Sequence, residues 1–402
     1  MPSFFRCRFV KVSAVFIAAV FALLAIRYYP RPPILKEIPL STAVYDRNGK
    51  LLRLSLAEDE IFRLWTPLQE ISPQLIKATL LYEDRLFYYH PGVNAASIVR
   101  GFVSSYILKT RPIGGSTITM QLVRRLYAIR SNTIGGKLKQ ILYALALEAR
   151  YSKDDILEAY LNTAPYGHNI EGVGSASLVY FNKRSAELAA FESLILAVIP
   201  QNPVKRLPTS EQGLIELKKA RDILFKHWLE KNPEDAWLIP NLKLPIDIKP
   251  IKALPFNSPH LVNSILNEHK GEVYTTVDSE VAEAIQNVIK EYTADSYNLG
   301  IYNASAILVD ASTMEVLAVV GSADFFNKEI EGEVDGTRAL RSPGSALKPF
   351  IYALAIDQGL IHPKTLLKDG KVRYGLYSPE NSDRTFKGPI SAAQALVASR
   401  NI

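Results

Sequence analysis

The sequence predicts a multidomain protein with an N-terminal transmembrane helix, a mainly α domain and an α/β domain. Three observations support this prediction: an uncharged apolar run at residues 12–26, helical periodicity across residues 41–207, and strand-like runs mixed with helices from residue 271 on. The chain has 402 residues, of which 48% are hydrophobic and 22% are charged. This composition is typical of folded proteins, and the length suffices for two or three domains.

The formal net charge is +7, which fits a partner that carries phosphates or an anionic membrane surface. A solvated basic surface explains the charge equally well. The sequence contains no long basic block and no zinc-finger or RNA-binding signature, so we expect no nucleic-acid partner. Cys7 is the single cysteine, which excludes an intramolecular disulfide, and the histidines show no HExxH spacing. These residues therefore do not predict a metal site.

The N-terminus predicts a cytoplasmic tail at residues 1–11 and a transmembrane anchor at residues 12–29. The apolar run rises only about 22 Å as a helix, but flanking Lys11 and Arg27 can snorkel, so a span is feasible. A cleaved signal peptide is the alternative, although no small-x-small cleavage site precedes Arg27. Either interpretation places the rest of the chain outside the cytoplasm.

Helix start signals divide the first domain, which we assign to residues 41–207. Ser72 followed by Pro73 is a good N-cap and first helical position. Ser152 and Asp155 resemble a capping box that opens the next helix. Between them, a helix from about residue 136 carries apolar residues at the spacing of a buried stripe, namely Leu138, Ile141, Leu142 and Leu145.

Proline density marks residues 208–270 as a linker around one polar helix, roughly residues 210–231. The α/β domain is assigned to residues 271–402. It begins with the predicted helix TVDSEVAEAIQNVIKEY, followed by two strand-like runs around a turn at Asp310.

Glu83 is the first candidate for chemistry. On the helix that starts near Pro73, Ile76, Leu80 and Glu83 share one face, so the carboxylate continues an apolar stripe. Burial of a carboxylate raises its pKa, as a general base requires. A solvated helix end is the alternative for Glu83 and Asp84.

A second group of candidates follows in Ser116, Thr117 and Gln121, which stand just after two glycines and at a helix start. Backbone N–H groups in such a place suit an anion or a sugar, although an ordinary capped helix start has the same pattern. Arg124 and Lys137 add cations that suit a pyrophosphate, with a solvated basic face as the alternative.

Taken together, these motifs carry a family resemblance. EDRLFYYHPG, GGSTITMQ, GKLKQ followed by ALALE, and ILEAYLN occur in an order and spacing similar to glycosyltransferase family 51. The downstream string DGTRALRSPGSALKPFIYALAIDQG resembles the start of a penicillin-binding transpeptidase domain. The pairing resembles the class A, bifunctional penicillin-binding proteins. It implies a lysozyme-like glycosyltransferase domain and an incomplete α/β domain of the serine acyl-transferase and β-lactamase type.

The resemblance implies polymerisation of lipid II into glycan strands, with release of undecaprenyl pyrophosphate at the outer face of the cytoplasmic (inner) membrane. Glu83 matches the general base. The positions that match substrate-binding residues are Asp84, His90, Ser116, Thr117, Gln121, Arg124, Lys137, Gln140 and Asn162. A divalent cation, Mg or Mn, is an optional cofactor at the pyrophosphate. The implied partners are lipid II, nascent glycan strands, the membrane and other cell-wall synthesis proteins. The apolar run at residues 101–108 is expected either to dip into the bilayer or to cover the core.

Gln140 departs from the family pattern, which has a glutamate at this position. An amide can donate a hydrogen bond but cannot take a proton, so cations alone would stabilise the leaving group, or activity would be weak. Glu148 is either a substitute for that glutamate or part of a structural salt bridge. Two other functions remain open, a lysozyme-like lytic glycosidase and a non-catalytic, membrane-tethered lipid II or wall-binding protein.

The second domain holds Ser345 and Lys348 one helical turn apart, the arrangement in which a lysine activates a serine nucleophile. Ser399 and Asn401 match the Ser-x-Asn element of the resembled transpeptidase. Its Lys-Thr-Gly element is absent, and the nearest string, Lys-Asp-Gly at residues 368–370, is predicted to be a hairpin turn. We therefore expect little or no transpeptidase activity and exposed strand edges around residues 305–320.

Overall fold

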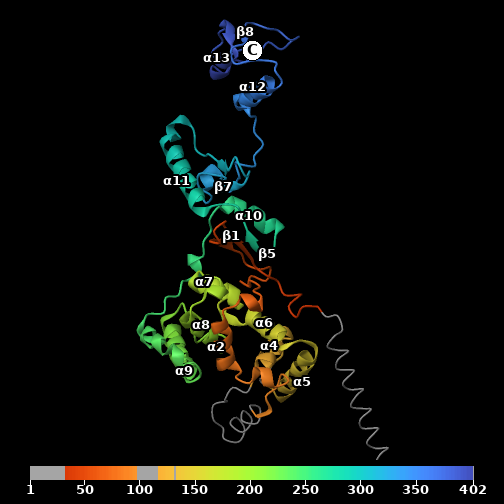
Figure 1. Cartoon of the computed structure of the whole chain (residues 1–402), viewed down its shortest axis with the longest axis vertical. Coiled ribbons are helices and arrows are strands. Elements are labelled where there is room, and N and C mark those ends of the chain that lie inside the picture. The colour runs from red at the N-terminus through yellow and green to blue at the C-terminus, as the bar shows by residue number, and fades with distance from the viewer. Residues whose placement is uncertain (1–31, 97–115, 131–132, 402) are drawn as a thin grey trace, which may run out of the picture. The chain divides into compact units, whose positions relative to one another are not determined.

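The computed structural model describes residues 32–96, 116–130 and 133–401, whose arrangement is shown in Figure 1. The predicted tail, the predicted anchor and the apolar run at 101–108 lie outside these residues. Within the described ranges, none of the helices combines the length and apolar character needed to cross a membrane. The chain separates into two compact units, Met1–Thr337 and Arg338–Ile402.

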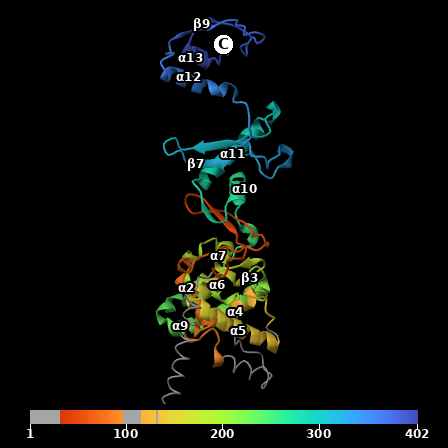
Figure 2. The same cartoon turned by 90° about the vertical axis from the view of Figure 1, so that its right-hand side faces the viewer.

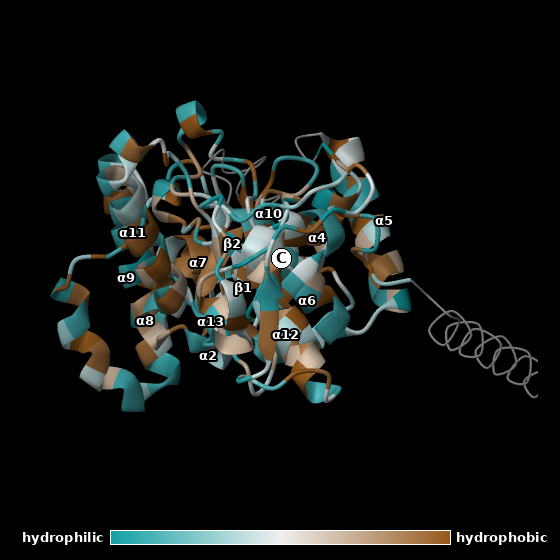
Figure 3. Ribbon diagram, turned by 90° about the horizontal axis from the view of Figure 1, so that it is seen from above, coloured by the Kyte–Doolittle hydropathy of each residue, from teal (hydrophilic) through white to brown (hydrophobic). Residues whose placement is uncertain are grey.

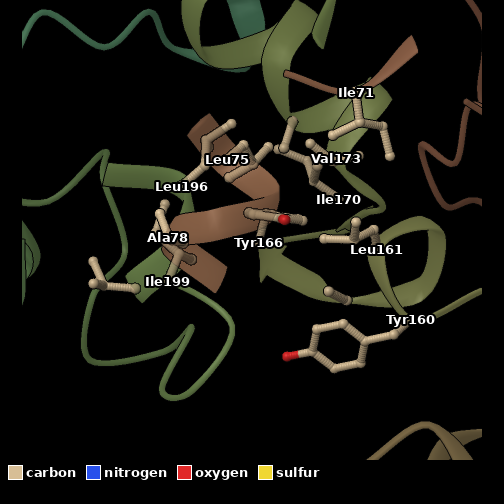
Figure 4. Packing of buried hydrophobic residues seen from close by; sticks show 14 of the residues in the cluster. Ile71, Leu75, Ala78, Tyr160, Leu161, Tyr166, Ile170, Val173, Leu196 and Ile199 are labelled. Atoms are coloured by element: carbon tan, nitrogen blue, oxygen red, sulfur yellow. The ribbon is translucent and has the colours of Figure 1, made fainter. Parts of the chain in front are cut away.

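The first unit contains a helical body around one large apolar core (Figures 1 and 4). Its helices are α2 Pro73–Glu83, α4 Ile118–Leu126, α5 Ile134–Arg150, α6 Lys153–Thr163, α7 Val173–Phe181, α8 Ala190–Val198 and α9 Glu211–Lys231. A small hairpin pairs β3 Pro165–Gly167 with β4 Ile170–Glu171. Helices α7 and α8 are apolar around most of their circumference, as their colouring in Figure 3 shows, because other elements cover them on several sides.

The predicted helix starts are confirmed. Ser72 is the N-cap residue of α2, and Pro73 occupies its first turn, where the missing N–H group costs nothing. At α6 the Ser152 side chain accepts from Asp155 N while Asp155 accepts from Ser152 N, which is a complete capping box. Helix α2 ends where Asp84 adopts φ −158°, so Glu83 is its last residue.

The buried stripe predicted for α5 was wrong. Leu138, Leu142 and Leu145 are exposed, and the buried face carries Gln140, Ala144 and Leu147 instead (three residues that share a face). The helix is apolar on two faces, so periodicity cannot choose between them. The choice depends on α4, which packs on the face that contains Gln140.

Helix α9 coincides with the helix predicted inside the linker, but it belongs to the helical body. Its buried residues Leu217, Leu224 and Phe225 are part of the large core, and α9 packs against α8 and α2. The charged residues at its exposed positions make the sequence look polar, although one face is apolar.

A three-stranded sheet joins distant parts of the first unit. Strand β1 Thr42–Tyr45 pairs antiparallel with β2 Leu51–Leu54 and parallel with β5 Gly271–Tyr274. Helix α10 Pro259–Glu268 covers it through a small cluster of Val44, Leu52 and Val262. The entire helical body therefore lies between two paired strands in the sequence.

The end of the first unit contains the predicted helix and strands. Helix α11 Ser279–Asp295 packs on the antiparallel hairpin of β6 Ala306–Val309 and β7 Val316–Val320 (Figure 2). Ala318 and Val320 of β7 are buried, whereas the three residues Ile307 to Val309 of β6 are exposed.

The second unit consists of α12 Lys348–Asp357, α13 Ala392–Val397 and the antiparallel pair of β8 Leu366–Asp369 and β9 Gly388–Ser391. The hairpin turn predicted at residues 368–370 was wrong: Lys368 and Asp369 end β8, and the partner strand begins only at residue 388. Asp369 is fully buried and accepts from Arg400 Nε at 2.7 Å, a long-range ion pair that local sequence does not reveal.

Short 3₁₀ helices connect the remaining elements. They are Leu68–Glu70, Phe87–Tyr89, Ser185–Glu187, Pro233–Lys243, Ile251–Ala253, Tyr297–Leu299, Lys328–Ile330 and Gly344–Leu347.

Candidate active site

Glu83 occupies the C-terminal end of α2 and is held from α4. Its Oε2 accepts a hydrogen bond of 2.7 Å from Gln121 Nε2, while Oε1 is enclosed and has no partner among the described residues. Burial raises the pKa of the Glu83 carboxyl; the hydrogen bond from Gln121 and the charges of Arg206 and Arg124 oppose this shift. A carboxylate with this environment suits proton abstraction near neutral pH.

Asp84 and His90 form a separate, structural pair beside Glu83. His90 Nε2 lies 3.0 Å from both carboxylate oxygens of Asp84, and Ile118 N donates to Asp84 Oδ2 at 3.1 Å. Because Ile118 opens α4, Asp84 connects the end of α2 to the helix that carries Gln121. Asp84 is buried and all its described contacts are internal.

The residues around the start of α4 make a cationic side of the site. Thr117 caps α4 by accepting from Met120 N at 3.2 Å, and Lys137 Nζ of α5 donates to Ser116 Oγ at 2.8 Å. Burial and the nearby Arg124 lower the pKa of the Lys137 ammonium. Mutual repulsion of Lys137 and Arg124 indicates a place that an anion would stabilise.

A partly buried brace contains the salt bridge that was one of the two roles expected for Glu148, with Lys153 as a partner that the sequence did not predict. Lys153 Nζ donates 2.7 Å hydrogen bonds to His90 O and to Glu148 Oε1, and Thr119 Oγ1 donates to the same Glu148 oxygen at 2.6 Å. At Gly92 (φ +87°) a Cβ atom would lie 2.7 Å from Glu148 Cγ, so only glycine fits over the brace. The ion pair with Lys153 favours the structural role for Glu148.

Gln201 and Arg206 were not predicted as site neighbours, because their contacts form only in the folded chain. Gln201 Oε1 accepts from Tyr82 Oη at 2.8 Å and from Arg206 Nη2 at 2.9 Å. This ties the turn after α8 to the last turn of α2, next to Glu83.

Gln140 lies in the contact between α4 and α5, and its Oε1 has no hydrogen-bond partner among the described residues. Its side chain is fully buried, and Nε2 donates to Met120 O at 2.5 Å across the α4–α5 contact. In this conformation the Nε2 group of Gln140 is engaged by the Met120 carbonyl and does not support the expected contact with the substrate. An amide can donate to a carbonyl oxygen, whereas an ionised glutamate cannot.

Gln140→Glu should destabilise the protein increasingly as the pH rises. While it is protonated, the new carboxyl can still donate to the Met120 carbonyl, but its ionisation places an unpaired charge in the core against that carbonyl oxygen, which costs about 1–3 kcal/mol or more. The pKa of the new carboxyl is expected to be raised in the fold, so stability is lost from the ordinary glutamate range upward. Thermal unfolding at pH 5 and pH 8 measures this, with exposed Gln212→Glu as control; a constant difference from wild type contradicts the assignment.

The described contacts of Asn162 are likewise internal. The residue is buried, and its side chain clamps Thr66 by accepting from Thr66 N and donating to Thr66 O, both at 2.8 Å, while Nδ2 also donates to Glu158 O. Oδ1 and both Nδ2 hydrogens of Asn162 are thus engaged by other residues of the protein, and the arrangement does not support the expected contact with substrate.

Asn162→Ala should lower the free energy of unfolding by about 1–3 kcal/mol, because the buried Thr66 N–H and C=O groups lose their partners. Chemical denaturation measures this loss. If the assignment holds, glycosyl transfer by the folded fraction keeps the wild-type KM; a raised KM with unchanged stability would return Asn162 to the substrate site.

In the second unit, the structure brings together Lys348, Ser399 and Asn401. Lys348 Nζ donates to Ser399 O at 2.7 Å, to Ser399 Oγ at 3.2 Å and to Asn401 Oδ1 at 2.6 Å. Burial lowers the pKa of the Lys348 ammonium. Ser345 lies in the preceding 3₁₀ turn and is exposed, and no described residue forms a hydrogen bond with its side chain.

The residues of the cationic side do not fit a metal ion held by the protein. Ser116, Lys137 and Arg124 are poor ligands for Mg²⁺ or Mn²⁺, which prefer carboxylate and carbonyl oxygens. Across residues 32–96, 116–130 and 133–401, no three histidine, cysteine, aspartate or glutamate side chains are grouped to bind a metal.

Comparison with known proteins finds two family matches along the chain. Residues 49–227 match the transglycosylase family model, and residues 304–402 match that of the penicillin-binding protein transpeptidase domain. Penicillin-binding protein 1C of Escherichia coli (strain K12) is 34% identical over 406 residues, which cover 98% of this chain and 51% of that protein. Penicillin-binding protein 2D of Bacillus subtilis (strain 168) is 31% identical over 426 residues, covering 97% and 58%, respectively.

The crystal structure of penicillin-binding protein 1A from Haemophilus influenzae aligns with a TM-score of 0.35 and 17% identity over 89% of this chain and 59% of that one. The chain spans 51% and 58% of the length of the two relatives compared above. The transglycosylase match covers the helical body, and the transpeptidase match follows it in the sequence. Residues 49–227 therefore carry the transglycosylase family and residues 304–402 the penicillin-binding transpeptidase family, and along 98% of its length the chain is similar to penicillin-binding protein 1C.

Proposed function

We propose that this protein is a peptidoglycan glycosyltransferase that polymerises lipid II, with Glu83 as its general base. The observation that carries the proposal is the pairing of an enclosed carboxyl of raised pKa, held by Gln121, with a cationic side formed by Lys137 and Arg124. Both lie within the transglycosylase match, which extends from residue 49 to residue 227.

The reaction follows from these two sides. Glu83 takes the proton of the acceptor's 4-hydroxyl, whose oxygen attacks the anomeric carbon of the donor and inverts it. The bond from that carbon to the pyrophosphate oxygen breaks, and the electron pair leaves with undecaprenyl pyrophosphate. Lys137 and Arg124 stabilise the growing negative charge, which requires no proton donor at position 140.

A lytic glycosidase is less well supported, because it would need a second free carboxylate across the sugar from Glu83. Asp84 is occupied by His90 and Ile118 N, and Glu148 by Lys153 and Thr119. Asp84 and Glu148 thus use their carboxylates for contacts within the protein.

The proposal includes a location at the outer face of the cytoplasmic membrane, with residues 12–29 as a single anchor. The exposed apolar face of α5 supports it: Ile134, Leu138 and Leu142 lie one turn apart, on the helix that also carries Lys137. Nascent glycan strands and other wall-synthesis proteins are the proposed partners. A divalent cation, if used, would be held by the substrate's phosphates rather than by protein ligands.

The second unit is proposed to hold the acyl-transfer residues Ser345, Lys348, Ser399 and Asn401. The contacts from Lys348 to Ser399 and Asn401 support this assignment.

Incubation of the purified chain with lipid II in detergent tests the function. Polymer of increasing length with release of undecaprenyl pyrophosphate is the expected result. Binding of lipid II without turnover would indicate a non-catalytic tether, and soluble fragments from purified sacculi would indicate a lytic enzyme.

A further inference from the structure

Three buried polar atoms near the C-terminal end of α2 lack a hydrogen-bond partner among the described residues. They are Thr79 Oγ1, Glu83 Oε1 and the Tyr160 hydroxyl. Thr79 and Glu83 lie one turn apart on α2, and Tyr160 comes from α6. Thr79 is 2% exposed and Tyr160 is 1% exposed, and in Figure 4 the Tyr160 hydroxyl points toward the side on which Ala78 of α2 lies.

Buried polar groups in proteins are almost always paired, either directly or through an ordered water molecule. Burial and the charge of Glu83 raise the pKa of the Tyr160 hydroxyl, so it stays protonated and is available as a donor. Glu83 has one oxygen engaged by Gln121 and the other open. Tyr160 thus supplies a donor and Glu83 an acceptor in the same enclosed region.

We propose that Tyr160 is a positioning residue for Glu83: its hydroxyl donates to a water molecule that in turn donates to Glu83 Oε1. The inference rests on the proposed role of Glu83 as the base. Together with Gln121, this water-mediated contact would hold both carboxylate oxygens and orient the carboxylate toward the acceptor sugar. A donor to the ionised form also opposes the effect of burial, so Tyr160 would set the pH above which the base works.

Other groups also act on Glu83 and must stay constant in any test. Those that face it are Asp84 at the helix end, Tyr82 on α2, Arg124 on α4, Tyr166 on β3 and Arg206 after α8. Tyr160→Phe changes none of them, because it removes one hydroxyl and keeps the ring.

The pH profile of lipid II polymerisation tests the proposal. In Tyr160→Phe the acid limb of kcat/KM should move to higher pH by roughly 0.5–1 unit, the effect of losing one hydrogen bond to the ionised base. The matched control is Tyr45→Phe, which removes the hydroxyl of another buried tyrosine, one that donates to Glu272 Oε1 at 3.2 Å. The control should leave the limb in place, and an unshifted limb in Tyr160→Phe would overturn the proposal.

Thermal unfolding tests the same contact without turnover. The loss of Tm caused by Tyr160→Phe should grow with pH when Glu83 is present and stay constant with pH in a Glu83→Gln background. Equal losses at every pH in both backgrounds would refute the contact. If the protein does not polymerise lipid II, the proposed function fails while this measurement still decides the inference.

Discussion

Glu83→Gln is expected to lower kcat for lipid II polymerisation by about 100- to 10,000-fold, the usual contribution of a general base. The amide keeps the shape of the side chain and can still accept from Gln121, but it cannot take the proton of the acceptor hydroxyl. Binding of lipid II should change little, because the loss concerns a step in the transition state.

Folding can be separated from catalysis in this variant. Since burial raises the pKa of Glu83 in the fold, ionisation costs stability as the pH rises above the ordinary glutamate range. Glu83→Gln removes this cost, so its Tm at pH 8 should equal or exceed that of wild type. Glu283→Gln, at an exposed position of α11, is the control for a general effect of charge. Polymerisation by Glu83→Gln at the wild-type rate would end the assignment of the base.

Lys137→Met should lower kcat by about 100- to 1,000-fold, the range for loss of one preorganised charge donor at a developing anion. Lys137 is half-buried beside Ser116 and Arg124, a setting that disfavours its charge until an anion arrives. Methionine preserves the packing, so Tm should not fall. Lys137→Arg should recover part of the activity.

The neighbouring Lys139→Met provides the matched control, because Lys139 is exposed and lies over the Tyr143 ring instead of the site. It should polymerise lipid II like wild type. Equal losses in the two methionine variants, measured in detergent with the same substrate, would point to general surface charge rather than to a pyrophosphate site.

The sequence predicted features that depend on local contacts. The capping box of Ser152 and Asp155 and the start of α2 at Pro73 involve neighbours within four residues, so their signals survive without tertiary structure. The face of α5 depends on the packing of α4, and there the prediction was wrong. An apolar pattern on two faces shows that a helix is partly buried, but not on which side.

The same distinction holds for the site. The position of Glu83 at the end of an apolar stripe was visible in the sequence, and the motifs located Lys137 and Gln121. Asn162 and Gln140 occur in motifs too, yet the structure gives each a buried backbone partner far along the chain. Lys153 was missed because its contact with Glu148 forms only where α4, α5 and α6 meet.

The parallel pairing of β1 with β5 has a consequence for the order in which the chain acquires its structure. Tyr45 and Glu272, whose side chains are joined by a hydrogen bond of 3.2 Å, are 227 residues apart. During synthesis, β1 and β2 leave the ribosome long before β5 exists, and an open loop of that length closes slowly. We therefore expect the helical body to fold before β5 pairs with β1, because the folded helices shorten the path between the two strands.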